Sequence, residues 1–259
     1  MTILTLPKQQ VRIDQGELVG YLVDGHELIH KKGSPGWRNS DTEMFPIIGP
    51  TNEADFKVHT PKGEAVQDQH GLLRELKYEL LEAADTKAVF EKRYQANTRI
   101  KNSKYPGKST APELFWPYDF NFKKSYHLKE DGLEICFEIE GEDGMPFMLG
   151  YHPAFSLTTE HPIIKSQKKE ISIPEVMAVG SRALQVPNES SIILKDQLEL
   201  TIKTEGFEHF MLWTEVPNMV CIEPITFYPY AVEQANLDAG FKYLNNSKPI
   251  VFRAFIHPK

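Results

Sequence analysis

Two residues that could transfer protons each stand directly before a proline in this sequence. His152 ends an apolar segment and precedes Pro153, and Glu223 follows a second apolar run and precedes Pro224. Proline restricts the residue before it to extended backbone conformations, so both side chains are expected on stiff segments. A general acid or base gains from such fixation, because its effect depends on its position relative to the reacting group.

Each of these residues also has an ordinary structural explanation. Most single histidines are structural or surface residues, and His152 could be a core histidine with a satisfied hydrogen bond. Glu223 could end a strand and point to water, which is the commoner place for a glutamate. If Glu223 is buried instead, it must be paired, hydrogen-bonded or functional.

Two further segments carry residues suited to ligand binding. In QHGLLR, His70 precedes Gly71, which allows a sharp turn or a close approach to a ligand, and Arg74 could bind a hydroxyl-rich or anionic group. In WRNSDTEMFPIIGP, Trp37 beside Arg38 could form a wall against which a sugar ring stacks. The alternatives are a turn followed by a solvent-facing arginine, and a loop that enters a buried strand.

Alternating apolar and polar residues indicate the elements that would position these side chains. In Leu133–Glu140 (LEICFEIE) every second residue is apolar, and Leu198–Thr204 repeats the pattern. A period of two buries one face of a strand and leaves the other in water. Asp131 and Gly132 form a turn signal between the first strand and Phe120–Leu128, which predicts a hairpin. These elements predict an all-β domain, either a sandwich or a barrel.

The segment Gly71–Tyr94 permits two interpretations. Its composition and the spacing of its leucines favour an amphipathic helix. Alternatively it forms two strands with a turn near Ala84 and Asp85, the second strand being Lys87–Tyr94. The second interpretation requires tertiary packing to override helix propensity.

Length and composition exclude several classes of protein. The chain has 259 residues, 41% of them hydrophobic and 25% charged, and its net charge is −7. An acidic chain is not expected to bind nucleic acid unspecifically, because that requires clustered cations that displace counterions from phosphates. No run approaches the ~20 apolar residues that a membrane-spanning helix needs. All-β sandwiches of this length often form one domain, so we expect a single domain over residues 1–259.

Signatures of metal, nucleotide and export sites do not emerge either. The nine histidines are scattered, no Cys/His pairing at ligand spacing is evident, and neither GxGxxG nor a P-loop is present. Cys136 and Cys221 form no CxxC motif, and the first ten residues show no apolar signal-peptide core. We expect a cytoplasmic protein without a metal site.

Five motifs, taken in order, resemble signatures of the aldose 1-epimerase family, the galactose mutarotase-like group of β-supersandwich proteins. The resemblance spans the chain from about Trp37 to Pro224, and the ordered histidine–proline and glutamate–proline pairs are its specific part. The motifs are FPIIG (45–49), QHGLLR (69–74), WPYDFNF (116–122), MPFMLGYHPAF (145–155) and CIEP (221–224).

The resemblance implies a large antiparallel β-sandwich with a sugar cleft. It implies that His152 matches the family's general acid, Glu223 its general base and His70 a second histidine that contacts the sugar. Arg74 matches an arginine that often follows that histidine, and Arg38 is a further candidate for sugar binding. The implied activity is that of an isomerase that interconverts the α and β anomers of a hexose by ring opening, without a cofactor. For this chemistry we expect Glu223 to be ionised and His152 protonated near neutral pH, held so by mutual attraction.

Two positions depart from the family pattern. Pro50 stands where the family often has an arginine, and Ile225 stands where a tryptophan often follows the Glu-Pro pair. An aromatic wall would then come from Phe227 or Tyr228.

Two alternative functions are compatible with the same fold. One is a hexose-6-phosphate 1-epimerase, which needs an arginine cluster for the phosphate, and the other is a carbohydrate-binding protein without turnover. In each case the expected partner is a small-molecule sugar, and neither nucleic acid nor a membrane is expected. We expect the chain to act as a monomer or a homodimer.

Overall fold

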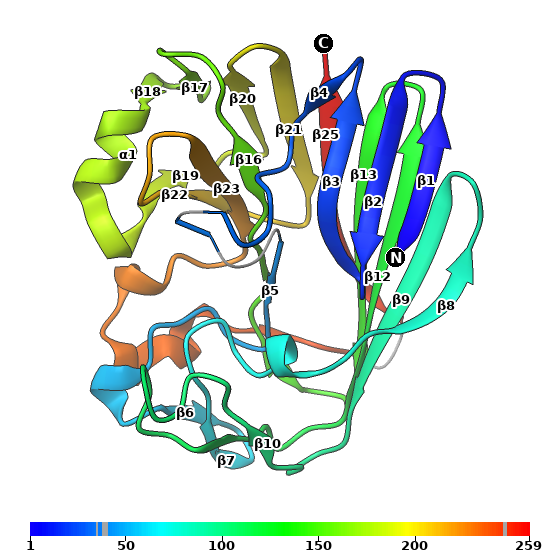
Figure 1. Ribbon diagram of the computed structural model, residues 1–259. Coiled ribbons are helices and arrows are strands. Elements are labelled where there is room, and N and C mark those ends of the chain that lie inside the picture. Colours follow the sequence, from blue (N-terminus) through cyan, green and yellow to red (C-terminus); the bar gives the residue numbers. More distant parts are fainter. Residues whose placement is uncertain (35, 38–40, 246–247) are drawn as a thin grey trace.

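The computed structural model describes residues 1–34, 36–37, 41–245 and 248–259. Most of its regular elements are β-strands, and the larger sheets are antiparallel, which confirms the all-β prediction (Figure 1). Within the described ranges, no helix has the length and apolar character needed to cross a membrane.

A nine-stranded antiparallel sheet forms the largest layer (Figure 1). The predicted hairpin lies in its middle, with the turn at Glu130 and Asp131, one residue earlier than predicted. Strand by strand across the sheet, the order is β18 (Glu170–Ser172), β17 (Ile163–Lys165), β20 (Ser191–Lys195), β21 (Glu199–Glu205), β25 (Ile250–Pro258), β13 (Gly132–Gly141), β12 (Phe120–Lys129), β9 (Lys87–Tyr94) and β8 (Glu79–Ala83).

A six-stranded sheet carries the residues that the sequence singled out for chemistry. Its central strand β23 (Met219–Ile225) is buried along its whole length, as expected for a strand that is covered on both faces. The other strands are β19 (Leu184–Pro187), β22 (His209–Trp213), β15 (Gly150–Tyr151), β5 (Glu43–Met44) and β16 (Ala154–Ser156), of which β22, β15 and β16 pair with β23.

A four-stranded sheet at the N-terminus packs against β9 and β12 of the large sheet (Figure 1). It consists of β1 (Thr2–Leu6), β2 (Gln9–Asp14), β3 (Glu17–Val23) and β4 (His26–Glu27).

Short elements complete the described part of the chain. The strand pairs are β6 (Lys57–Thr60) with β7 (Gly63–Val66), β10 (Ile100–Lys101) with β11 (Glu113–Leu114), and β14 (Pro146–Phe147) with β24 (Lys242–Tyr243). The helical turns are α1 (Ile173–Val179) and the 3-10 turns η1 (Asn52–Ala54), η2 (Leu73–Glu75), η3 (Gly180–Arg182), η4 (Pro229–Ala231) and η5 (Gln234–Gly240).

The ambiguous segment 71–94 adopts the strand alternative. After the short turn η2 it forms β8 and β9, and β9 pairs with β12 over eight residues. On β9, the side chains of Ala88, Phe90 and Tyr94 are buried in the core. The tertiary contacts of β9 therefore override the helix propensity of the segment.

One continuous cluster of buried apolar side chains connects the three larger sheets. It includes Leu4 from the N-terminal sheet, Phe122 from the nine-stranded sheet and Leu212 from the six-stranded sheet. The two principal layers therefore share a core, and the candidate site lies on strands that this core holds in place.

Candidate active site

His152 and Glu223 lie opposite each other on neighbouring strands. In the six-stranded sheet, Gly150 on β15 pairs with Ile225 on β23, and Ala154 on β16 pairs with Cys221 on β23. The residues midway between these partners are His152 and Glu223, so the common register places them face to face. Their prolines supply no N–H groups, which accounts for the break between β15 and β16 at this point. His152 Nε2 lies 3.2 Å from Glu223 Oε1.

Both side chains line a cavity of about 340 Å³. His152 is 6% exposed and Glu223 is 1% exposed, so the predicted pair is neither on the surface nor sealed from the cavity. The volume lies at the lower end of the range for small-molecule sites, which suits a ligand of monosaccharide size. Other lining residues include Trp37, Gln69, His70, Arg74, Lys104, Lys108, Met211, Trp213, Glu215 and Tyr230.

Burial shifts the pKa values of the pair toward the neutral forms. Loss of hydration lowers the pKa of His152 to about 3, with a smaller contribution from the charge of Arg74. Burial likewise raises the pKa of Glu223 well above its ordinary value. The expectation that mutual attraction maintains an ion pair is therefore wrong, because desolvation outweighs that attraction. A neutral imidazole beside a protonated carboxyl holds the same number of protons as the expected ion pair.

Two polar atoms of the pair have no hydrogen-bond partner among the described residues. These atoms are Nδ1 of His152 and Oε1 of Glu223. Oε1 of Glu223 lies close to Nε2 of His152, but the two groups are not aligned as a hydrogen bond. Buried polar atoms are normally hydrogen-bonded, so such atoms beside a cavity are suited to a polar ligand.

His70 reaches the same cavity from the QHGLLR segment. Its ring centroid lies 5.4 Å from that of His152, edge-on at 79°. Burial and the nearby His152 lower the pKa of His70 well below its ordinary value, so the ring is neutral. The turn depends on Gly71, whose φ is 70°, because a Cβ there would collide with the carbonyl oxygen of Phe45.

An aromatic wall covers the histidine. Trp37 stacks on His152 with centroids 4.8 Å apart and an interplanar angle of 28°, and its stacking against a sugar ring stays a prediction. Trp213 extends the wall, 5.8 Å from Trp37, and sequence reasoning missed it. Trp213 pairs with Cys221 across β22 and β23, so only the strand register shows that it shares the face of Glu223.

Phe227 and Tyr228 do not supply the aromatic wall. Both pack against a separate apolar cluster that contains Met44 and Ile225, and the aromatic residue from this region that lines the cavity is Tyr230. The replacement of the family's usual tryptophan by Ile225 is therefore not compensated by its neighbours in the sequence.

The two predicted arginines have different outcomes. Arg74 lies in η2 and lines the cavity, and its side chain is 22% exposed. Arg38 lies outside the described residues. His70 and Arg74 thus join the acid–base pair in one site.

A buried ion cluster supports the backbone next to His152. Lys124, fully buried on β12, contacts Asp41 at 2.6 Å and also pairs with Glu43. The carbonyl oxygen of Thr42, between these two acids, accepts a hydrogen bond of 2.8 Å from the N–H of His152. The cluster therefore ties the large sheet to the strand edge that presents His152.

Three potential metal ligands meet at the pair. Donor atoms of His152, Cys221 and Glu223 lie within 4.8 Å of one another, because Cys221 and Glu223 are two residues apart and share a face of β23. Cys/His/carboxylate sets of this kind bind zinc. A metal ion here would occupy the acid–base pair itself.

A second histidine pattern, HELIH at residues 26–30, has the HExxH spacing of zinc sites and was missed by the sequence reasoning. That motif requires a helix, which places both histidines on one face. Here His26 and Glu27 form strand β4, and the Glu27 carboxylate pairs with Arg12 and accepts the N–H of Tyr21. The segment therefore does not present the zinc geometry.

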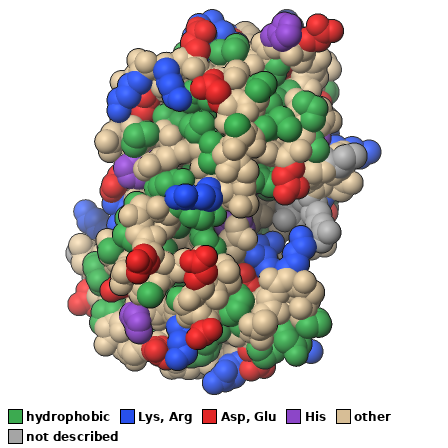
Figure 2. Space-filling view, turned by 90° about the vertical axis from the view of Figure 1, so that its left-hand side faces the viewer, with side chains coloured by type: hydrophobic (Ala, Val, Ile, Leu, Met, Phe, Trp, Pro, Cys, Tyr) green, Lys and Arg blue, Asp and Glu red, His purple; other side chains and the backbone are tan. Residues whose placement is uncertain are grey.

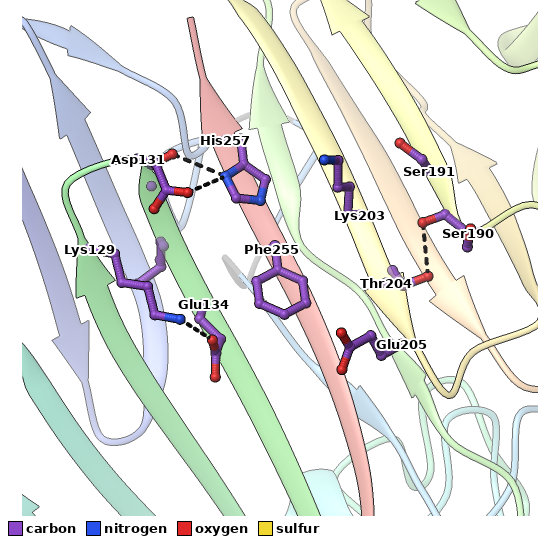
Figure 3. Close-up of a pocket in the computed structure, with 12 residues that line it drawn as sticks. Lys129, Asp131, Glu134, Ser190, Ser191, Lys203, Thr204, Glu205, Phe255 and His257 are labelled. Carbon is purple, nitrogen blue, oxygen red and sulfur yellow. Dashed lines mark hydrogen bonds and ion pairs between the residues drawn. The ribbon is translucent and has the colours of Figure 1, made fainter.

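Another depression, of about 460 Å³, lies over β13, β21 and β25 (Figure 3). Its charged groups are largely paired with each other, as in Lys129 with Glu134 and His257 with Asp131. None of the predicted site residues lines it.

Comparison with known proteins bears on the family of the chain. The aldose 1-epimerase family model matches residues 52–215, which include His70, Arg74 and His152 but end before Glu223. No curated protein matches the sequence.

Several solved structures share the fold. A galactose mutarotase-like protein from Lactobacillus casei is 15% identical, with a TM-score of 0.78 and full coverage of both chains. A galactose mutarotase related enzyme from Lactobacillus acidophilus is 18% identical, with a TM-score of 0.74 over 98% of this chain and 96% of the other. A galactose mutarotase-like protein from Clostridium acetobutylicum is 14% identical, with a TM-score of 0.70 over 99% and 94%. Since the family model covers more than half of the sequence, this chain belongs to the aldose 1-epimerase family.

Proposed function

We propose that this protein is an aldose 1-epimerase that interconverts the α and β anomers of a hexose without a cofactor. The observation that carries the proposal is the contact of 3.2 Å between His152 and Glu223 in a cavity of about 340 Å³. Anomer exchange needs one proton donor and one proton acceptor beside the same ring, and it needs no redox group.

The proposed step balances as follows. Glu223, ionised, removes the proton of the C1 hydroxyl, while His152, protonated, donates its proton to the ring oxygen. The bond between C1 and the ring oxygen breaks, and C1 becomes an aldehyde. Rotation about the C1–C2 bond exposes the other face of the aldehyde, and the reverse transfers close the ring.

The neutral pair fits the middle of this cycle. Ring opening leaves Glu223 protonated and His152 neutral, which is the state that burial favours. The starting ion pair arises when a proton moves from Glu223 to His152, and sugar hydroxyl groups stabilise it by replacing lost water. The environment thus favours the open-chain form, which lies uphill in solution.

The direct test is to replace the two groups that transfer protons. Glu223→Gln and His152→Asn should each lower the rate of anomer exchange by about 10²–10⁴-fold, the usual contribution of a positioned acid or base. The rate is measured by polarimetry on a freshly dissolved hexose, and circular dichroism checks the fold.

His59→Asn and Glu64→Gln are matched controls, because both residues are exposed on the small sheet β6–β7. Near-wild-type rates in either site variant would refute the assignment. Thermal stabilisation of the wild type by a sugar, without any rate enhancement, would instead support a carbohydrate-binding protein.

We further propose that the protein works in the cytoplasm, as a monomer or a homodimer. Cys136 and Cys221 are both free and buried, which is compatible with a reducing compartment.

A further inference from the structure

We propose that the cavity contains an anion subsite formed by Arg74, Lys104 and Lys108, and that the hexose substrate carries a phosphate group. The identity of the sugar rests on the proposed epimerase function. The subsite itself rests on the charges of the cavity and on the loop that presents them.

The cavity lining is positively charged although the protein is acidic. The chain has a net charge of −7, yet the described lining includes Arg74, Lys104 and Lys108 against the carboxylates of Glu215 and Glu223. Burial holds the pKa of Glu223 high, so this carboxyl adds little negative charge to the lining. A cleft with an excess of one charge attracts ligands of the opposite charge even when the whole protein repels them.

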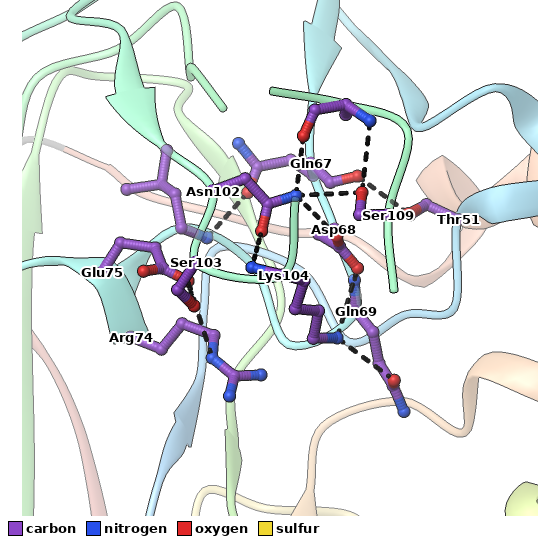
Figure 4. A network of polar contacts seen from close by, with 12 residues as sticks. Thr51, Gln67, Asp68, Gln69, Arg74, Glu75, Asn102, Ser103, Lys104 and Ser109 are labelled. Carbon is purple, nitrogen blue, oxygen red and sulfur yellow. Dashed lines mark hydrogen bonds and ion pairs between the residues drawn. The ribbon is translucent and has the colours of Figure 1, made fainter. Parts of the chain in front are cut away.

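A polar network pins the loop that carries the two lysines (Figure 4). The buried side-chain amide of Asn102 donates to Asp68 at 2.7 Å, to Ser109 at 3.0 Å and to the carbonyl oxygen of Ala111 at 3.0 Å. Because both ends of the loop are tied to one side chain, the lysines between them are held at the cavity.

The same network joins the loop to the segment that carries His70. Ser103 donates to Glu75 at 2.7 Å, and the ammonium group of Lys104 lies 3.2 Å from Asp68 and 3.4 Å from Gln69. The N–H of Lys108 donates to the carbonyl oxygen of Lys104 at 2.8 Å. Figure 4 shows Lys104 and Arg74 extending from the two joined segments. The two segments that carry the cations are thus tied to each other beside the cavity.

The cations retain capacity for a ligand. Arg74 meets its nearest carboxylate, Glu75, through Nε at 3.9 Å, which is too long for a hydrogen bond. No described residue forms an ion pair with Lys108, an exposed residue. Lys104 is half-buried, and burial lowers its pKa against the attraction of Asp68. An added anion would favour its charged form.

A phosphate group matches this set better than a hydroxyl or a carboxylate. A phosphate monoester carries close to two negative charges and three acceptor oxygens, and arginine can bind two of these oxygens at once. The three cations line the same cavity as His152 and Glu223, so a pyranose with C1 at this pair could present a phosphate on another carbon to them. Among the described residues, the arginine cluster that the hexose-6-phosphate alternative needs would be formed by one arginine and two lysines.

The test compares hexose, hexose 6-phosphate and hexuronate as substrates, by exchange NMR at equilibrium. We expect kcat/KM to be at least about tenfold higher for the phosphate than for the free hexose, as for a hydrogen-bonded charge pair. The kcat/KM for hexose 6-phosphate should also be higher than that for the hexuronate. Lys108→Ala should lower the preference for phosphate, measured as kcat/KM for hexose 6-phosphate divided by kcat/KM for the free hexose, by about tenfold. Lys101→Ala is the matched control, because Lys101 is exposed in the same region but does not line the cavity.

Equal kcat/KM for free and phosphorylated hexose, or an unchanged ratio in Lys108→Ala, would overturn the subsite. A preference for the hexuronate would overturn the assignment to phosphate. Calorimetry separates these results from a failure of the proposed function. If no sugar is turned over, tighter binding of hexose 6-phosphate than of hexose, lost in Lys108→Ala, still supports the subsite, and equal binding refutes it.

Discussion

At the scale of single residues, the site keeps ionisable groups in surroundings that oppose their charge. Glu223 and His152 are both nearly inaccessible, and burial moves their pKa values in opposite directions. Burying an ionisable group lowers the stability of the folded protein. It also shifts the pKa so that the side chain can take up or release a proton during a reaction, and shifted pKa values therefore concentrate at functional sites.

We predict that Glu223→Gln stabilises the protein increasingly as the pH rises. The unfolded chain ionises Glu223 near ~4.3, whereas the folded protein holds the proton to a higher pH because of burial. Between these two values the folded state binds more protons, so the stability of the wild type falls as the pH rises, by at most about 1.4 kcal/mol per pH unit. Glutamine does not titrate and avoids this loss.

Thermal melts of both proteins between about pH 4 and pH 8 measure this effect. The melting temperature of the variant minus that of the wild type should grow toward neutral pH. A difference that shrinks over this range would show that Glu223 is ionised in the folded protein. The ion pair expected from the sequence would then be correct.

At the scale of elements, the site depends on the junction of β5, β15 and β23. The ion cluster of Lys124, Asp41 and Glu43 fastens β5 to the large sheet, and Tyr151 on β15 donates to the same Asp41 at 2.9 Å. Lys124 also lies on the buried face of β12, where its neighbours at two-residue spacing, Phe122 and Tyr126, are both buried. A charge in this position is explained by its two acidic partners.

We predict that Lys124→Met destabilises the protein by about 3–5 kcal/mol, because it leaves two buried carboxylates without their cation. Lys123→Met is the matched control, since Lys123 lies on the opposite face of the same strand and is only half-buried. Chemical denaturation followed by circular dichroism gives both values. Equal, small losses in the two variants would show that the cluster is not needed for stability.

At the scale of the whole molecule, the sheets share one core, and we propose that the chain folds as one domain. The continuous cluster of buried apolar residues runs from Leu4 to Ile256. On the surface, charged side chains of both signs are mixed over the face seen in Figure 2, with Lys and Arg present at mid-height. Calorimetry is expected to show one cooperative transition, whose calorimetric and van't Hoff enthalpies agree. Two separable transitions would mean that the sheets unfold as independent units.

Much of the fold and part of the site could be predicted from the sequence. The strands β13 and β21 followed from strict alternation, because a half-buried strand imposes a period of two on its residues. Trp37, His70 and Arg74 were identified from short motifs, and all three line the cavity together with the acid–base pair. The extended backbone at His152 and Glu223 followed from the prolines after them.

Other features depended on contacts between distant segments. Helix propensity favoured a helix for the first half of segment 71–94, but pairing of β9 with β12 decided for strands. Trp213, Lys104 and Lys108 had no local signal, since strand register and the Asn102 network bring them to the cavity. The protonation of the pair also followed from burial, which a sequence does not show. Local sequence thus determined the backbone state and chemical type of the candidate residues, whereas tertiary packing decided their neighbours and their charge, because hydration and register are properties of the folded chain.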